Sequence, residues 1–204
     1  MSMTQEARFP ARRRPVLCRH ACAHRLVVSM IALAALPLLS SAAAAEVTSV
    51  GGGGFEVREQ VHVASAPAAV YAALLAPAHW WDPKHTYSGD AAHLTLEAKV
   101  GGCWCESIPG GGAVEHMTVI YLAPNKAVRF RGSLGPLQAM GVVGSLTITL
   151  ASAGTGTDVT FDYAIGGYAK DGFENLSKGV DAVLGSQAAR LKMLLETGAP
   201  SASS

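Results

Sequence analysis

Polar and apolar residues alternate along several stretches of the chain, and this two-residue period is typical of β-strands that bury one face. Turns rich in Gly, Pro and Asn separate most of the neighbouring stretches. Short turns join antiparallel neighbours, so the order predicts an antiparallel meander. The alternating or strand-like stretches lie at 55–63, 94–97, 103–108, 113–122, 128–131, 146–150 and 159–163.

Two other segments have helical character. Pro67 stands in the first turn of a short helix that Pro77 ends. A long helix is predicted over about 172–196, because apolar residues recur there at helical spacing. These apolar residues form a single wide stripe along the helix, and this stripe must pack on one face of the sheet. The predicted fold is therefore α+β, a helix-grip in which a curved antiparallel sheet of about seven strands wraps on a long C-terminal helix and can leave a cavity between them.

The first 45 residues differ from the rest. An Arg-rich stretch precedes an apolar run from Leu26 to Leu39, and small residues follow up to Ala45. The run is shorter than the roughly 20 apolar residues that span a bilayer, so it predicts a secretory signal peptide cut after Ala45. An uncut membrane anchor is the alternative, and Arg13-Arg14 raises a twin-arginine route. The predicted parts are a signal peptide (1–45), a flexible Gly-rich lead-in (46–54), one domain (55–197) and a disordered tail (198–204).

The predicted mature chain is weakly acidic. Ten Lys and Arg stand against fourteen Asp and Glu after residue 45, a net charge of −4. No basic patch is present, which argues against a nucleic-acid partner. We expect a periplasmic or secreted protein without a stable membrane anchor after cleavage, and without a cofactor, because no phosphate loop or other cofactor motif occurs. The sequence does not determine the oligomeric state.

The order of these elements resembles the START-like, or birch-pollen-allergen-like, helix-grip superfamily (SRPBCC), in its polyketide-cyclase-like and heat-shock-ATPase-activator-like bacterial branch. The resemblance covers about 55–196. It implies binding of lipids, polyketides or other apolar molecules in the cavity, with cyclisation or dehydration in a minority of members. It depends on VHVASAPAAVYAAL, WWDPKHTYSGD, KVGGCWCE, GPLQAMGVVGSLTITL and VDAVLGSQAARLK.

The expected ligand is a small apolar molecule, because the predicted cavity walls carry few charges. A loop over 132–144 with flexible Leu and Met side chains is a candidate lid. Two adjacent indoles cannot both point inward from a regular helix, so one of the Trp80–Trp81 pair is expected at the cavity mouth and the other on the surface; packing at a helix end is the alternative. The ligand-binding candidates are Trp80, Trp81, Trp104, Phe130, Leu137, Met140, Phe161, Val180 and Leu184.

Glu106 and His116 are the candidates for catalysis, on strands where they could face the cavity. Glu106 shares a face with Trp104, where apolar walls would raise its pKa and make it a proton donor. His116 is expected on the apolar face of its strand, as an acid–base group or as a hydrogen-bonded core residue. Because neighbours on a strand point to opposite faces, Glu115 and His116 cannot both face inward.

Cys103 and Cys105 share the opposite strand face from Trp104 and Glu106. A bond between positions i and i+2 is strained in a regular strand, so both are expected as free thiols that pack as small apolar residues. Metal ligation is the alternative and would need partners such as His79, His85, His93 or His116. Three functions thus remain open: an apolar-ligand binder, a cyclase or dehydratase using His116 or Glu106, and a metal- or redox-linked protein using the two Cys.

Overall fold

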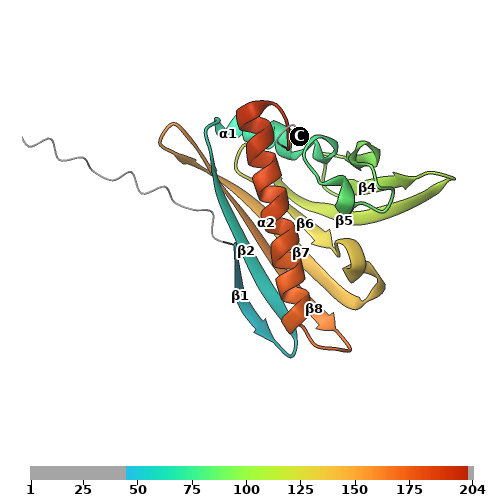
Figure 1. Cartoon of the computed structure of the whole chain (residues 1–204). Helices are drawn as coiled ribbons and strands as arrows, with labels where there is room; N and C mark the ends of the chain where they lie inside the picture. Colours follow the sequence, from blue (N-terminus) through green and yellow to red (C-terminus); the bar gives the residue numbers. More distant parts are fainter. Residues whose placement is uncertain (1–44, 202–204) are drawn as a thin grey trace, which may run out of the picture. The chain divides into compact units, whose positions relative to one another are not determined.

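The structure, a computed structural model, describes residues 45–201. Its main elements are one eight-stranded antiparallel sheet and a long helix (Figure 1). Residues 1–44 of the predicted signal peptide and residues 202–204 of the predicted tail lie outside this range. The strands follow the order β1-β2-β8-β7-β6-β5-β4-β3. The helix-grip prediction is confirmed, including the six strands after the first helix.

The strands are β1 (Ala45–Gly51), β2 (Gly54–Val63), β3 (Leu94–Leu96), β4 (Cys103–Ile108), β5 (Gly112–Ala123), β6 (Ala127–Gly132), β7 (Gly141–Ala153) and β8 (Gly156–Tyr168). The helices are α1 (Pro67–Leu74) and α2 (Glu174–Thr197). Four short 3₁₀ segments connect them: η1 (Pro77–His79), η2 (Pro83–His85), η3 (Ala91–His93) and η4 (Gly135–Ala139).

The core lies between the sheet and α2, which crosses one sheet face (Figure 1). Alternation explains this position, because the apolar residues of the central strands are buried while their neighbours are more exposed. In α2, Leu184, Ala188 and Leu191 are buried against the sheet. The helix ends at Gly198, whose φ of 79° forms a left-handed cap. No helix among residues 45–201 is long and apolar enough to cross a membrane.

Strand β1 was not expected, because residues 46–54 were predicted to be a flexible lead-in. The structure pairs this segment with β2, with Ala45 opposite Glu59 and Gly51 opposite Gly54. Gly52 and Gly53 form the turn of this hairpin. The glycines therefore make a tight reversal and place β1 at the sheet edge.

Strand β5 contains two irregularities that change which side chains point inward. Its pairing with β4 shifts between Trp104 and Cys105, and its pairing with β6 shifts between Val119 and Tyr121. A bulge places two residues opposite one and interrupts the alternation. As a result the adjacent residues His116 and Met117 are both buried. His116 is buried, but the prediction that regular alternation along the strand places it on an apolar face is wrong.

Candidate ligand-binding site

A pocket of about 550 Å³ lies between the first half of α2 and two connecting loops. Its size is within the range of small-molecule sites, about 300–1,000 Å³. The first loop contributes residues 84–87 together with Trp81, and the second contributes 134–137. From α2 come Asn175, Leu176, Gly179, Val180, Val183 and Leu184.

The helical wall is hollowed by the absence of a side chain at Gly179. A Cβ atom built at this position meets no other part of the protein within 4 Å. Glycine inside a helix costs about 1 kcal/mol relative to alanine. The space at Gly179 therefore leaves room for a ligand, whereas a Cβ atom at Gly185 would lie against the side chain of Glu59.

Polar side chains of α2 hold the first loop in place. The buried Gln187 accepts a hydrogen bond of 2.8 Å from the backbone N–H of Asp82. Arg190 donates from Nε to the carbonyl oxygen of Trp80 at 2.9 Å. Because these bonds tie the Trp80–Asp82 turn to the helix, they fix the position of Trp81 at the pocket wall.

The second loop is anchored from the sheet and from the first loop. The Tyr163 hydroxyl donates to the carbonyl oxygen of Gly132 and accepts from the N–H of Leu134, both at 3.3 Å. Burial raises the pKa of Tyr163, so this hydroxyl stays neutral. Across the pocket, the Tyr87 hydroxyl donates to the carbonyl oxygen of Gly135 at 2.9 Å. The Tyr87–Gly135 bond therefore joins the two loops directly.

The predicted ligand-binding residues separate into three groups. Trp81, Leu137, Val180 and Leu184 line the pocket. Met140 packs against the core from a partly buried position. The others are buried in the core without lining the pocket: Trp80, Trp104, Phe130 and Phe161.

Both indoles of the Trp80–Trp81 pair are buried, so the expectation that one of them lies on the surface is wrong. Trp80 follows a 3₁₀ turn and has irregular backbone angles, which frees the pair from the geometry of a regular helix. Their ring centroids are 5.4 Å apart, and Trp81 meets Trp104 edge-on at 5.1 Å. This aromatic cluster forms the rigid base of the first loop.

Sequence reasoning missed the polar part of the pocket, which comes from Lys84, His85, Thr86, Tyr87 and Asn175. The first four belong to the irregular connection after Pro77, where no periodicity indicates the direction of a side chain. The one feature of the sequence that could have indicated this polar wall is the mixture of aromatic and cationic residues in the long connection after Pro77. Binding residues are often found in such loops.

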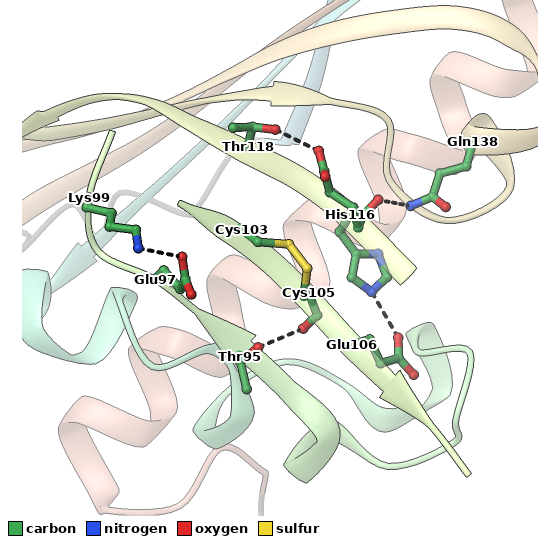
Figure 2. The surroundings of a disulfide bond; sticks show 10 residues. Thr95, Glu97, Lys99, Cys103, Cys105, Glu106, His116, Thr118 and Gln138 are labelled. Atoms are coloured by element: carbon green, nitrogen blue, oxygen red, sulfur yellow. Dashed lines mark hydrogen bonds and ion pairs between the residues drawn. A yellow bond between two sulfur atoms is a disulfide. The ribbon is translucent and has the colours of Figure 1, made fainter. Parts of the chain in front are cut away.

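Glu106 and His116 form a buried pair in the structure (Figure 2). His116 Nε2 lies 2.9 Å from Glu106 Oε2. The same carboxylate accepts hydrogen bonds from the backbone N–H groups of Tyr87 and Ser88. Glu115, the neighbour of His116, is exposed, which confirms that only one of the two faces inward.

The pKa of Glu106 is lowered, contrary to the expectation of a raised value. Burial acts to raise it, but the hydrogen bonds from Ser88, Tyr87 and His116 outweigh burial. The carboxylate is thus held ionised and serves as an acceptor for the first loop. Neither Glu106 nor His116 is among the residues that line the pocket.

Cys103 and Cys105 form a disulfide, so the prediction of free thiols is wrong (Figure 2). Their Cα atoms are 5.3 Å apart, within the range of about 4.4–6.8 Å that a disulfide spans. A regular strand rises about 3.3 Å per residue and would separate these Cα atoms by about 6.6 Å, so the chain is contracted here relative to the geometry on which that prediction depended. The bridge lies on the outer face, opposite the buried side chains of Trp104 and Glu106.

Metal ligation was the alternative for the two Cys. Within residues 45–201, no group of three or more His, Cys, Asp and Glu side chains is placed to hold a metal ion. Both sulfur atoms are used by the disulfide.

Residues 54–196 match the family described as "Polyketide cyclase / dehydrase and lipid transport". The match covers most of the chain, and the chain belongs to this family. The predicted resemblance to the SRPBCC superfamily is thereby confirmed. Members of the family generally bind small hydrophobic ligands, and both ligand binding and cyclase- or dehydrase-type chemistry occur within it. No curated protein matches the chain significantly.

Solved structures share the fold at low sequence identity. A conserved protein of unknown function from Enterococcus faecalis matches with a TM-score of 0.52 and 16% identity, covering 79% of this chain and 82% of that protein. A protein from Arthrobacter aurescens has the same TM-score and identity and covers 77% and 96%. The Aha1 protein from Colwellia psychrerythraea matches at 0.45 and 20%, covering 70% and 97%.

Proposed function

We propose that this protein binds a small, mainly apolar molecule in the pocket between α2 and the two loops. The observation that carries the proposal is the pocket itself, about 550 Å³ beside Gly179 and walled largely by apolar side chains. Closely packed interiors seldom leave space larger than a water molecule. Loops tied to α2 and to each other hold this space open, as expected of a preformed binding site.

Binding is better supported than a cyclase or dehydratase activity. A general acid or base must come within hydrogen-bond reach of the reacting group. The hydrogen bonds of the buried Glu106–His116 pair go to each other and to the backbone of the first loop. Tyr87 lies between this pair and the pocket, with its ring centroid 6.0 Å from that of His116. These contacts favour a structural role for the pair.

Displacement of a neutral fluorescent probe tests the proposal. We expect N-phenyl-1-naphthylamine to bind the purified protein with increased fluorescence. Val180→Trp adds an indole at the middle of the helical wall and is expected to weaken probe binding at least tenfold. Val143→Trp is the matched control, because Val143 is 56% exposed and lies outside the pocket. Probe binding that both variants retain at wild-type strength would contradict the proposal.

We also propose that the protein is exported and cut after Ala45. The Arg-rich stretch, the short apolar run and the small residues before Glu46 support this. The protein isolated from the periplasm or the medium should have Glu46, or a residue next to it, at its N-terminus. Recovery of the chain with residues 1–25 still attached would contradict export by cleavage.

A further inference from the structure

We propose that the ligand is an amphiphile with one anionic group, an apolar carboxylate, whose charged end lies at Lys84. This inference builds on the proposed function and specifies the class of ligand. The starting observation is the charge of the pocket lining, which includes one lysine and no carboxylate.

Four of the five polar residues that line the pocket come from the first loop, and their side chains include several hydrogen-bond donors. Lys84 and His85 are exposed on the first loop, and Asn175 lies in the first turns of α2. An ammonium group only donates hydrogen bonds, and imidazole and amide groups each supply at least one N–H. The remaining walls are apolar and come from the second loop and from α2. The ligand best matched to this lining has an apolar body and a single acceptor-rich end.

Lys84 is available for such a contact. Within residues 45–201, no salt bridge includes Lys84. The nearest acidic residue in the sequence, Asp82, accepts a hydrogen bond from the backbone N–H of Lys84. That bond caps the short turn η2 and fixes the backbone from which the lysine side chain extends.

Tyr87 separates the charged rim from the buried carboxylate of Glu106. Glu106 accepts from the backbone N–H of Tyr87, while the Tyr87 hydroxyl donates to Gly135. The buried negative charge of Glu106 is therefore stabilised by hydrogen bonds from groups other than a ligand. An anion at Lys84 meets no carboxylate among the residues that line the pocket.

The test compares decanoate with decan-1-ol as competitors for bound N-phenyl-1-naphthylamine. The two differ only in the end group, so their ratio measures recognition of charge. An exposed charge contact that is strengthened by hydrogen bonds is worth a factor of about three to ten. We expect decanoate to compete that much better than decan-1-ol in the wild-type protein. The preference should fall to about onefold in Lys84→Met and return in Lys84→Arg.

Lys126→Met is the matched control, because Lys126 is an exposed lysine in the turn between β5 and β6 and does not line the pocket. It should keep the preference for decanoate. Equal competition by decanoate and decan-1-ol in the wild type, or a preference that survives in Lys84→Met, would overturn the anion assignment and leave the proposed function standing. Failure of the probe and of both competitors to bind would overturn the proposed function as well.

Discussion

Helix α2 borders open space where it lines the pocket, and it packs closely where it faces Glu59 of β2. A glycine lies in each of these two regions, Gly179 at the pocket and Gly185 against Glu59. Above the pocket, a Cβ atom at Gly179 meets no other part of the protein within 4 Å. Above β2, a Cβ atom at Gly185 lies 3.2–3.3 Å from the carboxyl group of Glu59. The same residue type serves a cavity in one region and close packing in the other.

The close-packed region contains the buried carboxyl group of Glu59 with the partly buried Asp181 beside it. Glu59 is 2% exposed, and one oxygen atom each of Glu59 and Asp181 has no hydrogen-bond partner within the described part of the chain. Burial, with the neighbouring charge of Asp181, raises the pKa of Glu59 to about 8. The comparison shows that the pocket is not general looseness under α2, since the other side is packed closely enough to bury an acid.

Truncating one apolar residue in the packed core under α2 and one at the pocket tests this contrast most strongly. Leu191 is fully buried, and Leu191→Ala should lower the free energy of unfolding by about 3 kcal/mol because it leaves a cavity. Val180 borders existing space, so Val180→Ala should cost about 1 kcal/mol or less. Denaturant unfolding measures both. Equal losses in the two variants would mean that the pocket is closed in solution.

Glu59→Gln tests the packed region through pH. The pKa of Glu59 is about 4.5 in the unfolded chain and about 8 in the fold, so its favourable contribution is complete below pH 4.5 and is lost as the pH rises to about 8. The neutral variant should be more stable than the wild type at pH 9 by on the order of 2 kcal/mol. The gain should disappear near pH 4.5. Parallel stability curves for the two proteins over pH 5–9 would contradict this.

The disulfide lies on the outer sheet face, outside both the pocket and the close-packed region. Its removal therefore gives a stability change with which the changes in those two regions can be compared. It closes a loop of three residues, so Cys103→Ser with Cys105→Ser should cost on the order of 1.5 kcal/mol. Probe binding should not change. Mass spectrometry of the peptide containing residues 103–105 should show a mass lower by two hydrogens before reduction. Alkylation of both thiols without reductant would show that the bridge is absent.

The two glycines give the smallest effects, with opposite signs. Gly179→Ala should stabilise the fold by up to about 1 kcal/mol, because alanine favours the helix and the added methyl group has space. The same methyl group should weaken ligand binding. Gly185→Ala should lose stability, because the methyl group must displace the Glu59 carboxyl. Shifts of the unfolding midpoint in the same direction would remove the distinction between the two sides of α2.

The sequence predicted those parts of the fold in which alternation and helical spacing operate without interruption. These periods predict the central strands and α2. They also predict that the side chains of Trp104 and Cys105 point to opposite faces of their strand. The pocket walls from α2 and from the second loop could also be located, since Val180, Leu184 and Leu137 belong to apolar patterns.

The errors fall where the backbone departs from a regular period. A bulge cannot be detected from side-chain type, so the buried neighbours His116 and Met117 were missed. The Cys103–Cys105 bridge was missed because it requires Cα atoms closer together than in a regular strand. The 3₁₀ turn before Trp80 likewise allowed both indoles to be buried. The lowered pKa of Glu106 depends on two N–H groups from a distant loop, and no local pattern reports such contacts.

The pairing of β1 has a consequence for the order of events during synthesis. The proposed cleavage site follows Ala45, and Ala45 and Glu46 are already paired with Glu59 and Arg58 in the sheet. An extended segment bound in the cleft of a peptidase cannot at the same time be hydrogen-bonded to β2. Cleavage after Ala45 and closure of the β1–β2 hairpin therefore compete in time. A chain that folds too early would hide its own processing site.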